Sequence, residues 1–301
     1  MIQYVYMDIK TVLVRAVQDL KSHEDSDELT GSRIDSPALD AEVLLAHALG
    51  KDTGYLLSHS ADAAPEKSLA NFLKYIERRK NHEPVAYITG KKAFYGRDFI
   101  VSPSVLIPRP ETELIIDESL ARAQGNTLFM DVGTGSGAIA VTLAAESKKN
   151  IIAIDISNKA LRVAHENATL HNVAGKIELK QGNVLEPILN ESLNNYDCAI
   201  IAANLPYLTS RQYSKTQQEV QLFEPREALD GGNDGLDHYW KLFRQLQNNR
   251  NIFPNELYII FEIDPAQTEL IEPMISKTLP NAVFEIKKDL SGKDRVVVVR
   301  G

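Results

Sequence analysis

Cysteine is nearly absent from this chain of 301 residues, because Cys198 is the only one. A single cysteine excludes an internal disulfide framework and a zinc site built from cysteines, and it indicates a reducing compartment. No apolar run approaches the roughly 18 residues that a membrane helix needs. Residues 1–8 also lack the basic start and apolar stretch of a secretory signal. We therefore expect a cytoplasmic protein with no membrane association.

An excess of positive charge is missing too. The chain has 33 Lys and Arg against 41 Asp and Glu, a net charge of −8. Proteins that bind phosphate backbones usually carry the opposite sign over the binding face, so no direct nucleic-acid partner is expected. The seven histidines show no HExxH or comparable spacing, and the sequence therefore predicts no metal site.

The first 83 residues carry helical patterns. Apolar residues recur at helical spacing over 9–20 and after Pro65, with a polar stretch from His23 to Ser36 following the first helix. Between them, Ser36-Pro37 is typical of a helix start and Gly50 of a helix end. Residues 1–83 are predicted to form a small helical domain.

After Pro84 the residue pattern changes from helical spacing to short β-rich runs. Residues 85–88 and 94–101 are short β-rich runs bounded by glycine and proline, which favours a hairpin-like connector over residues 84–110. Pro108-Arg-Pro110 cannot be helical before its second proline. We expect this segment to be extended and to lead into a helix over about 111–123.

From Thr127 onward, compact apolar runs alternate with amphipathic helical stretches, as at 138–145 and 159–170. Alternating strands and helices with buried strands predict an α/β fold, a doubly wound parallel sheet over residues 111–301. Residues 283–286 and 296–299 could add a final strand pair. The expected core strands are 128–132, 151–155, 177–180, 198–202 and 257–263, with Cys198 packed inside one of them.

The sharpest local pattern is Asp131-Val-Gly-Thr-Gly-Ser-Gly137, between an expected strand and an expected helix. Glycines permit a tight turn and a close approach of the backbone to a ligand, and the following helix offers unpaired N–H groups. Asp155 ends the next strand, where a carboxylate can accept from two ribose hydroxyls. The pair predicts a nucleoside site, whereas the glycines alone are also typical of tight strand–helix packing.

The loop narrows the choice of nucleoside. It is not GxxxxGK[ST], which disfavours a nucleoside triphosphate, and it lacks the GxGxxG spacing of dinucleotide folds. Asp131 before the glycines opposes a pyrophosphate but suits a cationic amino-acid moiety. S-adenosylmethionine has that character, and it is the cofactor that the sequence predicts.

Asn204-Leu-Pro-Tyr207 follows the fourth expected strand and should face the same crevice. The Asn204 side-chain carbonyl and the Leu205 backbone carbonyl can together accept both hydrogens of a planar NH₂ group. Pro206 stiffens the loop, and Tyr207 can wall the pocket or stack on a flat substrate. Such a grip aims a weakly nucleophilic amide nitrogen at a methyl group. An ordinary Asn-x-Pro turn is the structural alternative.

With these motifs the chain resembles the HemK/PrmC family, the S-adenosylmethionine-dependent N5-glutamine methyltransferases of peptide chain release factors. The resemblance covers almost the whole chain, and the Pro-Arg-Pro-Glu-Thr-Glu segment carries much of it. Besides the glycine loop, its segments are Leu39-Asp-Ala-Glu-Val-Leu-Leu45, Glu83-Pro-Val-Ala-Tyr-Ile-Thr-Gly90, Ile107-Pro-Arg-Pro-Glu-Thr-Glu113, Phe223-Glu-Pro225, Gly231-Gly-Asn-Asp-Gly-Leu-Asp237 and Lys288-Asp-Leu-Ser-Gly-Lys-Asp-Arg295.

The resemblance implies a class I methyltransferase fold and a role for each candidate residue. The glycine loop would hold the methionine portion of S-adenosylmethionine, Asp155 the ribose and Asn183-Val184 the adenine. The helical domain would help to dock the Gly-Gly-Gln loop of a class I release factor, and we expect a monomer. The implied cofactor residues are Asp131, Gly133, Thr134, Gly135, Ser136, Gly137, Asp155, Asn183, Val184 and Asn204; the implied catalytic and substrate residues are Asn204, Leu205, Pro206 and Tyr207.

Three positions depart from the family pattern. Leu205 stands where the family usually has proline, Asn183 where an acid is common, and Asp264 where glycine is common. The backbone carbonyl of residue 205 survives the first change. Other functions stay open: an adenine-N6 methyltransferase of RNA or DNA, a glutamine methyltransferase of a ribosomal protein, or a non-catalytic binding module. The helices come first in this chain and the net charge is negative, which disfavours the nucleic-acid enzyme.

Overall fold

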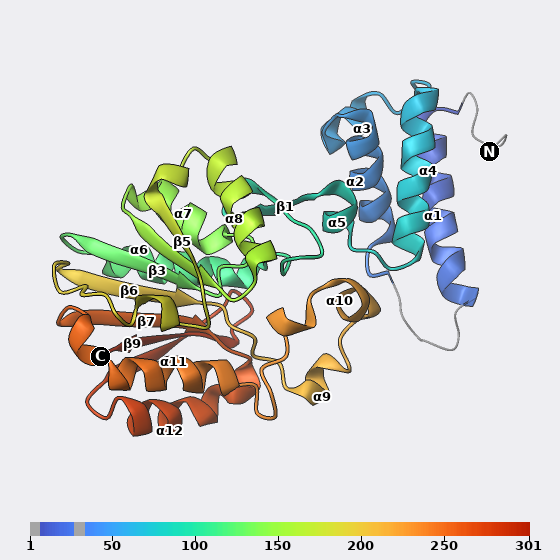
Figure 1. Ribbon diagram of the computed structural model, residues 1–301. Coiled ribbons are helices and arrows are strands. Elements are labelled where there is room, and N and C mark those ends of the chain that lie inside the picture. Colours follow the sequence, from blue (N-terminus) through green and yellow to red (C-terminus); the bar gives the residue numbers. More distant parts are fainter. Residues whose placement is uncertain (1–6, 27–33) are drawn as a thin grey trace. The chain divides into compact units, whose positions relative to one another are not determined.

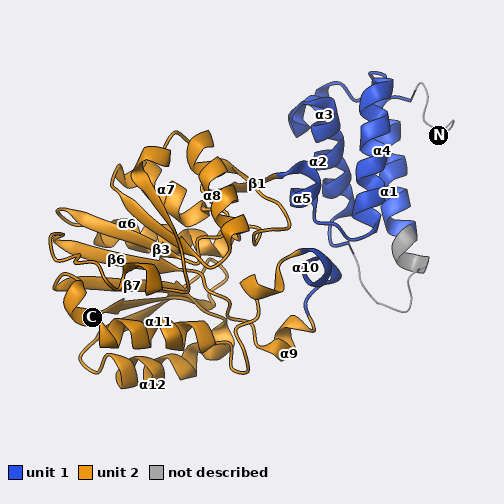
Figure 2. Ribbon diagram, in the orientation of Figure 1, with its two compact units in different colours: residues 1–90, 216–223 blue, residues 91–215, 224–301 orange. Residues whose placement is uncertain are grey.

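The computed structural model describes residues 7–26 and 34–301. The chain divides into two compact units, one of Met1–Gly90 with Thr216–Phe223 and one of Lys91–Lys215 with Glu224–Gly301 (Figure 2). Within the described ranges, no helix combines the length and the apolar character needed to cross a membrane.

The first unit is helical, as predicted. Its core is formed by buried side chains such as Val12, Leu44 and Phe72. The first helix continues to Ser26, past the expected start of the polar stretch at His23, and residues 27–33 of that stretch lie outside the described residues. The helices of this unit are α1 (Ile9–Ser26), α2 (Pro37–Leu49), α3 (Thr53–Ser58), α4 (Glu66–Lys80), α5 (Val85–Thr89) and α10 (Gln218–Phe223).

The expectation of a β-rich run over residues 85–88 was wrong, because these residues form helix α5. Pro84 precedes its first turn, and its carbonyl accepts the N–H groups of Tyr87 and Ile88. Gly90 ends the helix with a φ of 71°, a left-handed conformation that glycine adopts without strain. Burial of the Tyr87 and Ile88 side chains outweighs the strand propensity of their residue types.

Helix α10 comes from far along the chain, and no sequence pattern joined it to the helical unit. Arg79 explains the attachment. Its buried guanidinium donates to Asp40 Oδ2 at 2.7 Å and to Glu219 Oε2 of α10 at 2.6 Å. Removing either partner of such a buried pair leaves an uncompensated charge.

The second unit contains a seven-stranded sheet in the order β5-β4-β3-β6-β7-β9-β8 (Figure 1). The first five strands in this order are parallel, and β9 runs antiparallel to both of its neighbours. The α/β fold class and the final strand pair are thus confirmed. The strands are β3 (Thr127–Val132), β4 (Ile151–Asp155), β5 (Ile177–Gln181), β6 (Cys198–Ala203), β7 (Glu256–Glu262), β8 (Val283–Lys288) and β9 (Asp294–Arg300).

Helices cover both faces of this sheet, so alternate strand residues are buried on opposite sides. Phe129 packs with residues of α6 (Glu113–Arg122), α7 (Ala138–Ser147) and α8 (Asn158–Leu170). Its neighbours Leu128 and Met130 pack with residues of α11 (Asp237–Asn248) and α12 (Thr268–Thr278). Burial on both faces explains why these strands are continuous apolar runs in the sequence. Cys198 is fully buried in β6, as predicted.

Shorter elements complete the second unit. A hairpin does form, but not from the two expected runs: it consists of β1 (Lys91–Phe94) and β2 (Arg97–Ile100), paired antiparallel. The helix expected from residue 111 is α6, which follows a 3₁₀ turn, η2 (Pro110–Thr112). The remaining short helices are α9 (Ser210–Tyr213), η3 (Ala174–Lys176), η4 (Glu186–Ile188), η5 (Arg226–Ala228), η6 (Arg250–Ile252) and η7 (Pro265–Gln267).

Candidate active site

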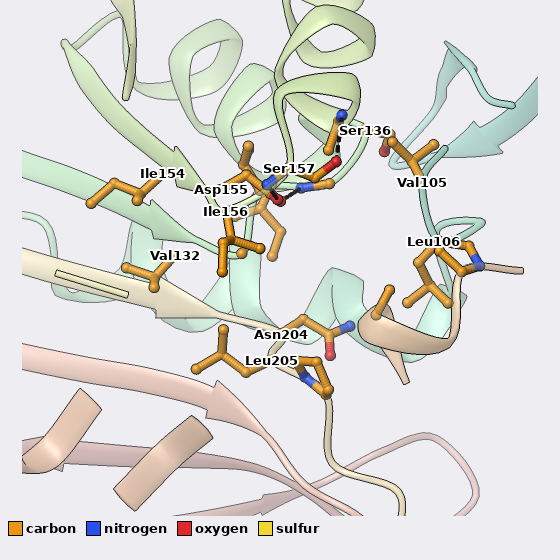
Figure 3. A pocket seen from close by; sticks show the side chains of 18 of the residues that line it. Val105, Leu106, Val132, Ser136, Ile154, Asp155, Ile156, Ser157, Asn204 and Leu205 are labelled. Atoms are coloured by element: carbon orange, nitrogen blue, oxygen red, sulfur yellow. Dashed lines mark hydrogen bonds between the residues drawn. The ribbon is translucent and has the colours of Figure 1, made fainter. Parts of the chain in front are cut away.

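A cavity opens where β3, β4 and β6 end, the place where parallel sheets of this kind bind their ligands. It contains about 1120 Å³ of space, open solvent at its mouth included. Figure 3 shows Asp155 and Ser157 on one side of the cavity and Asn204 and Leu205 on another.

The glycine loop forms the cavity wall after β3. The N–H groups of Gly133 and Thr134 both donate to Ile154 O at 2.9 Å, which ties the loop to β4. Gly133 has a φ of 80°, which favours glycine, and a Cβ there would lie 2.9 Å from Leu205 Cδ2, so any side chain would have to displace the Leu205 side chain. Gly137 has a φ of 80°, and a Cβ there would lie 3.1 Å from two atoms of Ala164 in α8. The glycines therefore serve packing and ligand approach together.

Asn167 also stabilises the glycine loop, and no sequence motif pointed to this residue. Its Nδ2 donates to Ser136 O at 2.8 Å and to Ile100 O at 2.9 Å, and its Oδ1 accepts from Ile100 N. The side chain is fully buried. A single asparagine thus joins the glycine loop to the hairpin strand β2.

Asp155 lies at the end of β4, as predicted, and lines the cavity. Its Oδ2 accepts from Gly135 N and its Oδ1 from Ser157 N, both at 2.8 Å. Each carboxylate oxygen keeps a further lone pair for a ligand hydroxyl. Burial raises the pKa of Asp155, and the nearby carboxylate of Glu227, which also lines the cavity, raises it further. Two carboxylates in one cavity favour a cationic ligand.

Asp131 lies behind the glycine loop and does not line the cavity. Its Oδ2 accepts from Thr134 Oγ1 at 2.6 Å and from Ala140 N at 3.0 Å. The side chain is fully buried, and burial raises the pKa of Asp131 to about 7. Its Oδ1 has no hydrogen-bond partner among the described residues. The structure therefore connects Asp131 to the cavity through Thr134 and the start of α7.

Asn183 and Val184 line the cavity after β5, next to Gly182. Val184 has a φ of 62°, which is rare for a β-branched residue and costs on the order of 1–2 kcal/mol. Gln245 of α11 stabilises this turn, because its side chain accepts from Leu185 N at 2.8 Å and donates to Asn183 O at 3.4 Å. Gln245 is a second supporting residue that sequence patterns did not reveal.

Asn204 follows β6 and lines the cavity, as predicted. Its Nδ2 donates to Thr112 Oγ1 at 2.9 Å, and Thr112 Oγ1 donates to Glu262 Oε2 at 2.6 Å. No donor to Asn204 Oδ1 occurs in the part of the chain that the structure describes. The amide is therefore anchored by its nitrogen, which leaves its oxygen available to a ligand.

Leu205 and Pro206 also line the cavity, whereas Tyr207 is not part of its wall. The Leu205 side chain is buried in the sheet core, and its N–H donates to the Tyr239 hydroxyl at 3.2 Å. The Tyr207 hydroxyl donates to Glu262 Oε1 at 2.8 Å, and Gln267 Nε2 donates to the Tyr207 carbonyl. The structure thus uses Tyr207 to hold the loop.

The remaining wall comes from the segment after β2, including Arg109 and the residues Val105 and Leu106 that Figure 3 shows. Glu224 fixes this wall: its Oε1 accepts from Arg109 Nη2 at 2.5 Å and its Oε2 from Ile107 N at 3.1 Å. Glu113 of the same segment accepts from Tyr95 N. The conspicuous Pro-Arg-Pro-Glu-Thr-Glu segment therefore supplies both a wall residue, Arg109, and the Thr112 partner of Asn204.

Two protein-family models match the chain, the PrmC N-terminal domain over residues 22–90 and a methyltransferase domain over residues 123–280. A release factor glutamine methyltransferase of Bacillus subtilis is 36% identical over 264 residues, which cover 85% of this chain and 89% of that protein. One of Nitratidesulfovibrio vulgaris is 36% identical over 277 residues, with coverages of 90% and 91%. The chain belongs to the release factor glutamine methyltransferase family.

A fold comparison agrees with this family assignment. The hMettl16 catalytic domain in complex with MAT2A 3'UTR hairpin 1 matches with a TM-score of 0.52 and 11% identity, covering 98% of this chain and 91% of that one. At this identity the match shows the class I methyltransferase fold alone. As a release factor glutamine methyltransferase family member, the chain is an enzyme that uses S-adenosylmethionine as methyl donor.

The residues of the cavity fit this cofactor. A Cβ on Gly135 would have no neighbour closer than Gly133 O at 4.0 Å, so the loop leaves open space at its centre. Asp155 offers two acceptor oxygens for hydroxyls, and Asp155 with Glu227 offers negative charge toward a sulfonium or ammonium group. Within residues 7–26 and 34–301, no three His, Cys, Asp or Glu side chains gather as metal ligands.

Proposed function

We propose that this cavity transfers a methyl group from S-adenosylmethionine to the side-chain nitrogen N5 of the glutamine in the Gly-Gly-Gln motif of class I release factors. The names of the curated relatives support the substrate class. The observation that carries the proposal is the anchoring of the Asn204 NH₂ group on Thr112, because it leaves Oδ1 as the atom that can accept from a substrate amide.

The chemistry follows from the weakness of an amide as a nucleophile. Its nitrogen lone pair is delocalised, and it is too weak an acid for a side-chain base to ionise. Asn204 Oδ1 and the Leu205 carbonyl accept the two N–H bonds, which holds the nitrogen in place and stabilises the positive charge that develops on it. S-adenosylmethionine supplies an electrophilic methyl group when bound. After transfer the nitrogen is positively charged and readily loses a proton to water.

Asp155 and the glycine loop are proposed to bind the cofactor, Asp155 at the ribose and residues 133–137 at the methionine portion. Asn183 and Val184 are proposed to face the adenine. The hydrogen bonds from Gly135 and Ser157 to Asp155 support this arrangement, because they fix the carboxylate before any ligand binds. Asp131 is proposed to act indirectly, by holding Thr134 and the first turn of α7.

The domains are proposed to divide the work. Residues 1–83 dock the release factor, residues 84–110 connect, and residues 111–301 carry the transfer. The match of residues 22–90 to the PrmC N-terminal domain supports a substrate-specific role for the helices. We propose a cytoplasmic monomer without direct nucleic-acid contact, in agreement with a release-factor substrate and the net charge of −8.

The test is incubation of the protein with labelled S-adenosylmethionine and, in separate reactions, a class I release factor, ribosomal proteins and rRNA. Label on the glutamine of the Gly-Gly-Gln motif is the expected result. Label in rRNA would favour the adenine-N6 reaction. Label on a ribosomal protein would identify that protein, and not the release factor, as the substrate. Label in none of them, with cofactor binding intact, would indicate a binding module.

A further inference from the structure

Glu262 is a buried carboxylate with no role so far, and both of its oxygens point at residues of the site. It is the last residue of β7 and is 1% exposed. Its Oε2 accepts from Thr112 Oγ1 at 2.6 Å and its Oε1 from the Tyr207 hydroxyl at 2.8 Å. Thr112 in turn accepts from Asn204 Nδ2 at 2.9 Å. One acid is thus linked to both polar side chains of the Asn204–Tyr207 segment.

The available protons fix the donor and the acceptor in each of the hydrogen bonds that link Asn204, Thr112 and Glu262. An ionised carboxylate only accepts hydrogen bonds, whereas a threonine hydroxyl has a single proton to donate. Thr112 donates that proton to Glu262, so only its lone pairs remain for Asn204. A lone pair attracts the NH₂ side of the Asn204 amide and repels its oxygen. The amide therefore has one favoured orientation, with Nδ2 toward Thr112 and Oδ1 free.

We propose that Glu262, acting through the Thr112 hydroxyl, is the positioning residue that sets the amide orientation of Asn204 and so makes the site select an NH₂ group over a carboxylate. This inference rests on the proposed function, since it concerns the glutamine substrate. Neither residue reacts. Their role is to choose which end of an otherwise nearly symmetric side chain meets the substrate.

The choice matters because glutamine and glutamate have nearly the same shape. A free Asn204 Oδ1, together with the Leu205 carbonyl, accepts from an amide and repels a carboxylate. The reversed amide would present NH₂ to the cavity, donate to a carboxylate and clash with the hydrogens of a glutamine side chain. Sites built around such unpaired polar groups discriminate strongly between isosteric ligands. Glu262 and Thr112 therefore contribute to substrate selection.

The protonation state of Glu262, and with it the orientation of the Asn204 amide, depends on pH. Burial raises the pKa of Glu262, and Glu111 raises it further, whereas the hydroxyls of Thr112 and Tyr207 and the charge of Arg295 lower it. The Tyr239 hydroxyl donates to the backbone carbonyl of Glu262. A protonated Glu262 would donate to Thr112 and release its hydroxyl proton toward Asn204. Turnover is therefore expected to fall as the pH drops through the pKa of Glu262.

The test compares three variants with wild type, and kcat is also measured as a function of pH for wild type and Glu262→Gln. Thr112→Val removes the hydroxyl at nearly constant volume, and Thr112→Ser keeps it. Thr142→Val is the matched control, because Thr142 is a fully buried threonine of α7 whose hydroxyl has no partner among the described residues. Each protein is assayed for kcat, for the dissociation constant of S-adenosylhomocysteine, and for binding of a release factor with either Gln or Glu in its Gly-Gly-Gln motif.

We expect Thr112→Val to lower kcat and to reduce the preference for Gln over Glu, each about tenfold, the worth of one hydrogen bond of about 1.4 kcal/mol. Binding of S-adenosylhomocysteine should stay close to the wild-type value. Thr112→Ser should recover most of both losses, and Thr142→Val should show neither. If Thr112→Val folds poorly, Glu262→Gln takes its place, since its amide can both donate and accept and so loses the fixed direction.

Three outcomes would overturn the inference. The first is an unchanged Gln preference in a folded Thr112→Val enzyme, and the second is the same loss in Thr142→Val. The third is an acid limb of the kcat profile that stays identical when Glu262 becomes Gln. If the wild-type protein does not methylate the release factor, the proposed function fails as well. A normal wild-type rate with unaffected variants rejects only the role of Glu262.

Discussion

The backbone N–H of Gly135 donates to Asp155 Oδ2 at 2.8 Å, so the centre of the glycine loop is tied to the carboxylate at the end of the neighbouring strand. Two features that are 20 residues apart in sequence thus form one preorganised surface. The loop cannot move without releasing the acid, and the acid cannot turn away without releasing the loop. Cofactor binding is therefore expected to depend on both together.

Asp155→Asn should weaken binding of S-adenosylmethionine. Asparagine has one acceptor oxygen, so it cannot satisfy Gly135 and Ser157 and still accept from two ribose hydroxyls. Losing charge-assisted hydrogen bonds raises the dissociation constant by about 10- to 100-fold. Isothermal titration calorimetry measures the change. An unchanged dissociation constant would remove Asp155 from the cofactor site.

Gly137→Ala should destabilise the protein more than Gly135→Ala. Both glycines have positive φ, 80° and 53°, and each alanine costs about 1 kcal/mol for backbone strain alone. At Gly137 the new methyl group also lies 3.1 Å from the Ala164 Cα and Cβ, whereas at Gly135 it enters open space. Urea unfolding of the two variants without ligand measures the difference. Equal losses would show that the α7–α8 contact is not tight.

Asp131→Asn should flatten the dependence of stability on pH. Burial raises the pKa of Asp131 to about 7 in the folded state, above the ordinary 3.8. Between these values the folded protein binds the extra proton, so this residue makes the folded state less stable as the pH rises. From about pH 5 to about pH 8 the variant should gain about 3 kcal/mol of unfolding free energy relative to wild type.

Urea unfolding of both proteins at the two pH values tests this expectation. The comparison with wild type cancels the contribution of Glu262, whose pKa is also raised but which does not interact with Asp131. A constant difference between variant and wild type across this range would show that Asp131 stays ionised in the folded protein.

Asn204→Ala should reduce turnover far more than it weakens cofactor binding. The variant loses the Oδ1 acceptor but leaves the Asp155 side of the cavity intact. Removing one donor or acceptor that stabilises developing charge lowers kcat by about 100- to 1,000-fold. Measured side by side, kcat and the dissociation constant of the cofactor separate the two roles. Comparable losses in both would place Asn204 mainly in the cofactor site.

Strands and the glycine loop were predictable because their signals are local. The apolar run of β3 and the glycines after it lie within a dozen residues, and burial on both faces of the sheet gives each central strand a readable pattern. The same holds for Asp155 and Asn204, which directly follow such runs. Their place at the carboxyl ends of parallel strands follows from the topology alone.

The supporting residues were not predictable, because their partners are distant in sequence. Thr112 contacts Glu262 across 150 residues and Asn204 across 92. Asn167 and Gln245 similarly reach over 67 and 60 residues to the elements they hold. A lone threonine or glutamine has no spacing that reveals such a role. Helix α5 was missed for a related reason, since tertiary burial of its β-prone residues decided its conformation.

In the proposed reaction, Asn204 Oδ1 and the Leu205 carbonyl together hold the substrate nitrogen. A crystal structure of the protein with S-adenosylhomocysteine and a Gly-Gly-Gln peptide tests it most directly. Both oxygens should lie about 3 Å from the glutamine side-chain nitrogen, with Asn204 Nδ2 still on Thr112. A complex in which the Asn204 side chain turns away from the bound glutamine would show that other groups hold the substrate nitrogen.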